Sequence, residues 1–118
     1  MSNNTKIIIL DPSTITQDPE EQQKLVKYID AIIETSNRKS DIMNTVSGYI
    51  DTESEIFIKN FIEAYINTKR AYVIAIMDAL KAFGKEAEMQ DSIDHNGLDV
   101  KNISYSFYDN YKTATLVL

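Results

Sequence analysis

Residues 52–83 read TESEIFIKNFIEAYINTKRAYVIAIMDALKAF, and they decide the fold. Thr52 and Glu55 have the spacing of a capping box, in which each side chain accepts a hydrogen bond from the backbone amide of the other residue. Apolar residues then recur at steps of three and four, as on one face of a helix. No Gly or Pro interrupts the segment. The sequence therefore predicts one long helix from Thr52 to Phe83.

This predicted helix is apolar on two sides. Between Ala71 and Phe83 only Asp78 and Lys81 are charged, a pattern typical of a helix that is buried from several directions. Large apolar residues form one face, which we expect to be core. Small residues on the other face allow a second helix to approach closely, and closed dimers are the commonest oligomers. The residues expected at a homo-oligomer interface are Ala64, Ala71, Ala75 and Ala79.

Length and composition limit the class of protein. A chain of 118 residues fits a single domain, with residues 1–5 expected to be a flexible tail. The absence of cysteine excludes disulfides and thiolate metal sites. The formal net charge of −6 disfavours nucleic acid as a partner and favours a basic protein. Abundant Ile, Asn, Lys and Tyr suit an AT-rich genome, and we hypothesise that a phage or mobile element carries the chain.

No segment has the features of a membrane span or a secretory signal. The apolar run after Arg70 is shorter than the roughly 20 residues that a spanning helix needs. The N-terminus, MSNNTKIIIL, lacks a long apolar core and a small-residue cleavage site. We therefore expect a cytoplasmic protein that does not contact a membrane.

The first half of the chain predicts a strand and a second helix. Residues 6–10 are β-branched and almost wholly apolar, which suits a short strand buried on both faces. Asp18 followed by Pro19 is a typical helix start. The buried stripe of the helix that follows is expected to contain Leu25, Tyr28, Ile29, Ile32 and Ile33.

The polar residues 35–41 leave two alternatives. They have low helix propensity but contain neither Gly nor Pro, and the apolar stripe resumes in phase at Met43 and Val46. This phase favours one long helix, kinked near Asn37, over two helices with a loop. Gly48 is the expected end of the helix, and a short connection to Thr52 predicts an antiparallel hairpin.

The C-terminal segment predicts a β-hairpin. Ile103, Tyr105 and Phe107 alternate with polar residues, as in a half-buried strand, and Asp109-Asn110 suits a two-residue turn. A lone hairpin is marginal in water, so we expect it to pair with residues 7–10. The predicted fold class is α+β and mostly helical: a long antiparallel αα-hairpin with a small sheet made from the N-terminal strand and the C-terminal hairpin.

Candidate catalytic residues are few. Asp11 follows an apolar strand, where α/β enzymes often place a metal-binding or phosphate-binding acid, but Asp11-Pro12-Ser13 is ordinary turn chemistry. His95 is the single histidine and lies in a predicted turn without the partners of a catalytic triad. We therefore assign no catalytic residue, no metal and no cofactor.

Two surface features indicate binding instead. Two basic pairs lie near the middles of the predicted helices and form a candidate anion-binding patch, although they also suit ordinary ion pairs: Arg38, Lys39, Lys69 and Arg70. Aromatic residues gather on the C-terminal hairpin and form a candidate partner-binding surface, although strand propensity alone explains them: Tyr105, Phe107, Tyr108 and Tyr111.

The leading functional hypothesis is a non-enzymatic interaction protein. Such a chain would act as a homo-oligomer that binds another protein, as regulators, inhibitors and structural adaptors do. The alternative is a small module that binds an anionic ligand or nucleotide at the basic patch between the helices. Nucleic-acid binding comes third, because the charge opposes it.

Overall fold

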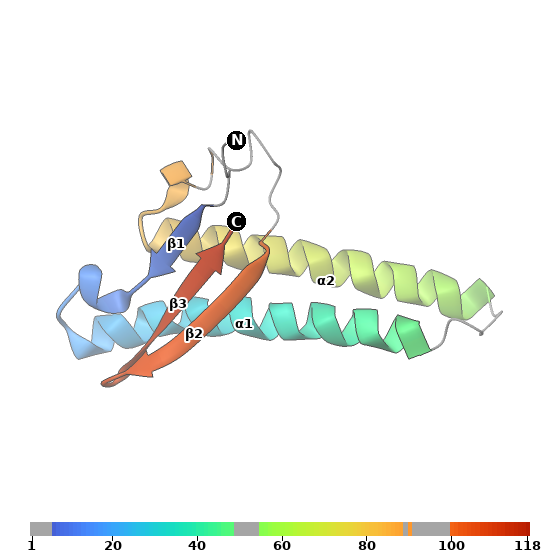
Figure 1. The fold of residues 1–118 in the computed structure, drawn as a ribbon, viewed down its shortest axis with the longest axis horizontal. Helices are drawn as coiled ribbons and strands as arrows, with labels where there is room; N and C mark the ends of the chain where they lie inside the picture. The colour runs from blue at the N-terminus through green and yellow to red at the C-terminus, as the bar shows by residue number, and fades with distance from the viewer. Residues whose placement is uncertain (1–5, 49–54, 89, 91–99) are drawn as a thin grey trace.

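The computed structural model describes residues 6–48, 55–88, 90 and 100–118. In chain order its elements are β1 (Ile7–Leu10), the 3-10 helix η1 (Pro12–Thr14), α1 (Pro19–Gly48), α2 (Glu55–Ala82), β2 (Asn102–Tyr108) and β3 (Tyr111–Val117). The two long helices lie side by side and form one layer, and the three strands form a sheet on one side of it (Figure 1). The predicted fold class, a mostly helical α+β fold built on a helical hairpin, is confirmed.

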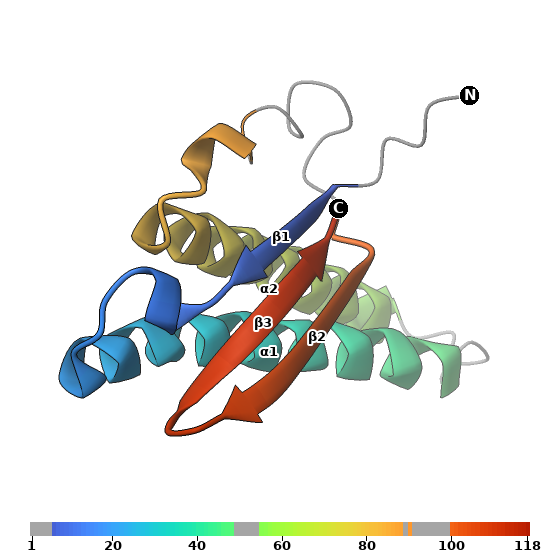
Figure 2. The same ribbon diagram turned by 60° about the vertical axis from the view of Figure 1, so that its left-hand side comes forward.

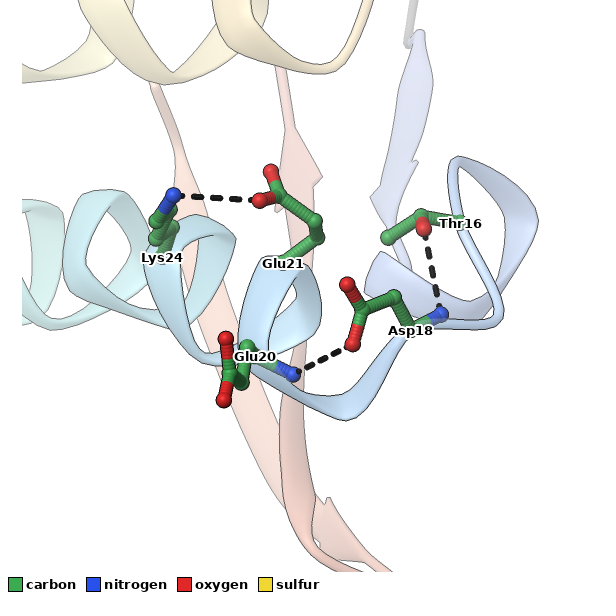
Figure 3. Close-up of polar contacts among 5 residues, drawn as sticks. All are labelled: Thr16, Asp18, Glu20, Glu21 and Lys24. Atoms are coloured by element: carbon green, nitrogen blue, oxygen red, sulfur yellow. Dashed lines mark hydrogen bonds and ion pairs between the residues drawn. The ribbon is translucent and has the colours of Figure 1, made fainter.

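The start of α1 is fixed by the residues that the sequence indicated. The Asp18 carboxylate accepts a hydrogen bond from the backbone N–H of Glu20 at 3.1 Å, and the Thr16 hydroxyl accepts one from the N–H of Asp18 at 3.1 Å (Figure 3). Glu21, in the first turn, pairs with Lys24 at 3.0 Å. These contacts satisfy amides that no helical carbonyl can reach, and the acids suit the positive end of the helix dipole.

The polar residues 35–41 belong to α1, which runs without a break from Pro19 to Gly48. This confirms the alternative of a single helix, which the phase of the apolar stripe favoured. The hydroxyl of Thr35 donates to the backbone carbonyl of Ala31 at 2.9 Å, so this polar side chain is accommodated within the helix. The capping box at Thr52 lies outside the described residues.

The end of α2 is a Schellman motif centred on Gly84. Gly84 adopts φ 68°, a left-handed conformation that side chains with a Cβ disfavour. Its N–H donates to the carbonyl of Lys81 at 3.1 Å, and the N–H of Lys85 donates to the carbonyl of Leu80 at 2.7 Å. The helix therefore stops where the sequence places its first glycine after residue 52.

The three strands form one antiparallel sheet in the order β1-β3-β2. The predicted turn at Asp109-Asn110 is confirmed, since Tyr108 pairs with Tyr111 across it. Asp109 has φ 53°, as the first central residue of a type II′ turn requires. The strand order itself was not readable from the sequence, and it makes the last strand of the chain the central one.

The core lies between the helical layer and one face of the sheet. It contains residues from α1, α2, β1 and β3, with Ile29, Ile32, Ile76, Leu80 and Leu116 fully buried. The helices cover only this face (Figure 2). The prediction that β1 is buried on both faces is therefore wrong: Ile8 and Leu10 are buried, whereas Ile7 and Ile9 are exposed on the other face.

Strand β2 is less buried than the sequence predicted. Ile103 packs against the core, but Tyr105 and Phe107 on the same face are exposed. The reason is geometric: the strands run obliquely across α1, so the helix covers only part of β2 (Figure 2). The expectation of a half-buried strand therefore holds at Ile103 alone.

Replacing the cap of α1 tests how this fold is held at its start. We expect Asp18→Ala to lower the free energy of unfolding by about 1 kcal/mol, because the N–H of Glu20 loses its acceptor. Asp18→Asn keeps a good capping oxygen and should lose much less. The measurement is a urea denaturation midpoint for both variants, and equal midpoints would contradict a capping role for Asp18.

Candidate functional site

The first half of α2 extends beyond the sheet (Figure 1), and it carries an exposed apolar stripe. Ile58, Ile62 and Ile66 are spaced four residues apart, and their exposed fractions are 48%, 49% and 47%. We refer to these three residues as the isoleucine stripe. The sequence assigned them to the core, but in this part of the structure α1 is the single element described beside α2, and two helices leave one face of each uncovered.

The fold divides the alanines that were expected to form an oligomer interface. Ala75 and Ala79 are buried in the core of the protomer, while Ala64 and Ala71 are exposed. The small side chains at 75 and 79 therefore serve the packing of α2 within its own chain. This corrects the expected interface, because Ala75 and Ala79 are not available to a second copy.

The aromatic residues of the C-terminal hairpin do not form one continuous surface. Tyr105, Phe107 and Tyr108 are exposed, whereas Tyr111 is buried and meets Tyr108 edge to face at 5.9 Å between ring centroids. The Lys112 ammonium lies over the rings of Tyr105 and Phe107, at 5.4 and 4.9 Å from their centroids. It also pairs with Asp30 of α1. Tyr105 and Phe107 thus remain accessible on the helix-facing side of β2.

The four basic residues proposed for anion binding are not brought together in one pocket. Arg38 pairs with Glu34 one turn earlier in α1 at 2.7 Å, and Lys69 and Arg70 are exposed on α2. Of these four residues, Lys39 lines a hollow of about 350 Å³ between α1, Tyr72 of α2 and the start of β2. Its ammonium lies 5.1 Å from the centroid of the Tyr72 ring.

This hollow contains groups that suit an anion. Lys39 is joined there by Lys101, a residue that the sequence did not single out because it stands alone next to a strand. The remaining polar lining consists of hydroxyl and amide side chains from Ser36, Ser40, Asn44 and Asn102. Two ammonium groups with hydroxyl and amide donors form a typical binding surface for a phosphate or carboxylate group.

Asp11, the candidate acid at the end of β1, has a structural role in the turn that follows the strand. The Asp11 carboxylate accepts hydrogen bonds from the backbone N–H and the hydroxyl of Ser13, at 3.0 and 2.8 Å, and so caps η1. This is the turn role that the sequence predicted. His95 lies outside the described residues. Within residues 6–48, 55–88, 90 and 100–118, no group of three or more histidines and acids is arranged to hold a metal ion.

None of the helices that the structure describes is long and apolar enough to cross a membrane. Comparisons of the chain with protein-family models, curated proteins and solved structures gave no match.

Matched substitutions at Ala71 and Ala75 test whether the first of these alanines is exposed and the second buried. Ala75→Glu places a carboxylate in the core, and we expect it to lower the free energy of unfolding by several kcal/mol, about 3 or more. Ala71→Glu changes an exposed position one turn away and should alter stability by less than about 0.5 kcal/mol. Denaturation curves measure both effects, and a well-folded Ala75→Glu variant would contradict the burial of this position.

Proposed function

We propose that this chain is a small, acidic, non-enzymatic protein that binds another protein and acts as a homo-oligomer. A regulator, an inhibitor and a structural adaptor all fit this description. The observation that carries the proposal is the isoleucine stripe on the part of the hairpin beyond the sheet. A contiguous row of large apolar side chains on a soluble surface typically marks a protein-binding site.

The stripe suits an amphipathic helix of the partner. Isoleucines spaced four residues apart present a straight apolar ridge, against which a helix can lay residues with the same spacing. Covering them is favourable, since burying apolar surface contributes about 25 cal/mol per Å². Met77, also exposed on α2, lies three turns after Ile66 on the same side of the helix and continues the apolar surface toward the end of α2.

The charges beside the stripe limit the kind of partner. Glu55, Lys59 and Glu63 flank Ile58 and Ile62, and together with them line a shallow, mainly apolar hollow. Two of these three flanking charges are acidic, and the chain as a whole carries a formal charge of −6. A partner helix with basic residues beside its apolar face would therefore be attracted to this surface and oriented on it.

Substitution within the stripe tests the proposal. We expect Ile62→Asp to weaken partner binding by tenfold or more, because it places a charge at the centre of the apolar contact. Its folding stability should change little, since the side chain is half exposed. Asn67→Asp adds the same charge at an exposed position of α2 outside the stripe and is the control.

The experiment has two stages. A photoreactive amino acid at position 62, or at the exposed position 60 as a control, first captures the partner in an extract of the source cells. The affinity of the identified partner is then measured by titration calorimetry for the wild type, Ile62→Asp and Asn67→Asp. Capture at position 60 but not at 62, or equal affinities for all three proteins, would contradict binding at the stripe.

A second candidate function is the binding of a small anionic ligand in the hollow beside Lys39 and Lys101. The observation that favours it is the convergence of these two ammonium groups with hydroxyl and amide side chains in one hollow. A phosphate or carboxylate group would pair with the lysines and accept hydrogen bonds from the hydroxyl and amide side chains.

For this second candidate, Lys39 and Lys101 should act together. We expect inorganic phosphate or ADP to shift the NMR signals of residues around the hollow, with a dissociation constant that rises about tenfold in Lys39→Ala or Lys101→Ala, as the loss of one charged hydrogen bond implies. Lys69→Ala, an exposed lysine outside the hollow, should leave the affinity unchanged. No shift at millimolar ligand, or equal effects at all three lysines, would remove this candidate.

A further inference from the structure

Strand β2 ends the sheet on one side, and among the described residues no other strand pairs with its outer edge. Its seven residues, NISYSFY, contain no charge and no proline. Natural proteins usually protect edge strands by short length, charged side chains or proline, because exposed N–H and C=O groups recruit further strands. The opposite edge, β1, has only four residues, and Lys6 next to it donates to the carbonyl of Glu88 at 3.3 Å. The unprotected edge is therefore β2.

Hydrogen bonds elsewhere in the sheet show which residues of β2 face this edge. Lys6 and Leu118 exchange backbone hydrogen bonds of 3.3 and 2.8 Å, so the even-numbered residues at the end of β3 direct their backbone groups to β1. Because the direction alternates along a strand, the odd-numbered residues of β3 direct theirs to β2. These odd-numbered residues of β3 stand opposite the even-numbered residues of β2, which therefore direct their own backbone groups to β3. The N–H and C=O groups that remain for the open edge belong to Ile103, Tyr105 and Phe107.

We propose that β2 pairs antiparallel with β2 of a second copy, centred on Tyr105, so that the two sheets become one. This identifies the contact that makes the protein a homo-oligomer, and in that respect it rests on the proposed function. The edge-facing residues of the two copies stand opposite each other only in every second register, because a shift of one residue puts each of them opposite a residue whose backbone groups point away from the edge. Of these registers, the one centred on Tyr105 pairs all seven residues of both strands. In it, Asn102 of each copy stands opposite Tyr108 of the other copy.

Charge complementarity supports a second copy as the occupant. The strand is preceded by Lys101 and followed by Asp109, and both side chains are exposed. In the register centred on Tyr105, Lys101 stands opposite Asp109 of the second copy, and the two-fold axis repeats this pair at the other end. Opposite charges thus meet at both ends of an otherwise uncharged strand. Any other register separates these opposite charges, so the charges favour the register centred on Tyr105.

The pairing also accounts for the exposed aromatic rings. Ile103, Tyr105 and Phe107 lie on the helix-facing side of the sheet, since they stand opposite Leu116, Ala114 and Lys112. Tyr105 and Phe107 are nevertheless 55% and 73% exposed, because α1 covers only the Ile103 end of β2. In the pair, Tyr105 meets its own copy and Phe107 meets Ile103 of the second copy. The joined strands therefore gather these side chains into one apolar cluster.

Charge reversal with rescue tests the register. The wild type should be a dimer by light scattering at micromolar concentration. Lys101→Asp and Asp109→Lys each place like charges opposite one another at both ends and should raise the dissociation constant at least tenfold. The double variant restores opposite charges and should recover the wild-type value. If both single variants are folded and dimerise more weakly, but the double variant does not regain the wild-type dissociation constant, this register is overturned.

Cysteine cross-linking tests the two-fold axis independently. The protein has no cysteine of its own. Tyr105→Cys places two sulfurs opposite each other across the axis, with Cα atoms about 5.5 Å apart, a distance that a disulfide spans. Under mild oxidation it should form covalent dimers, whereas Ser104→Cys alone should not, because Ser104 stands opposite Ser106. Mixing Ser104→Cys with Ser106→Cys should give mixed dimers.

The outcomes separate this inference from the proposed function. A dimeric wild type whose mass and cross-linking ignore all these substitutions associates through another surface, which overturns the β2 pairing but leaves the homo-oligomer standing. A wild type that is monomeric at micromolar concentration overturns both the β2 pairing and the homo-oligomer. Binding of a partner at the isoleucine stripe is measured separately, and neither result decides whether that binding occurs.

Discussion

The packing of α2 against α1 and one face of the sheet is the contact on which the rest of the structure depends. Ile76, Ala79 and Leu80 of α2 are fully buried in a core shared with Ile29 and Ile32 of α1 and with residues of the strands. The small side chain of Ala79 keeps α2 close to its neighbours, while the large ones fill the space between the layers. An isolated two-stranded hairpin is marginal in water, and packing against a helix stabilises it. The helices give β1 and the C-terminal hairpin the apolar surface that holds them together.

This arrangement also explains why so much apolar surface is left over. The helices are long and the sheet is narrow, so the sheet covers one end of the hairpin and leaves the other end as two helices. At that end the isoleucine stripe is exposed. Because the strands run obliquely across α1, the helix likewise leaves the end of β2 with Tyr105 and Phe107 uncovered. Both candidate surfaces follow from the same mismatch in size and direction between the two layers.

The two surfaces have different chemistry and lie on different elements. The stripe offers side chains alone, which suits an apolar helix face, whereas the edge of β2 offers backbone groups, which suit another strand. A dimer joined through β2 would carry two copies of the stripe. Two stripes on one dimer would bind a partner with two helices, or two copies of a partner, more tightly than one stripe alone, because the second contact forms at high local concentration.

The sequence by itself determined the local elements, because their signals lie within a few residues of one another: Asp18 and Pro19 start α1, the phase of the apolar stripe carries it through residues 35–41, and Asp109-Asn110 turns the hairpin. It also indicated that α2 has more apolar surface than one neighbour can cover. Only the tertiary structure decided which of that surface is buried. Ala75, Ile76 and Ala79 are buried in the core and the isoleucine stripe remains exposed, because the position of the sheet along the hairpin depends on contacts between residues far apart in the chain. The strand order, the open edge of β2 and the presence of Lys39 and Lys101 in one hollow depend on the same distant contacts, which periodicity and spacing cannot reveal.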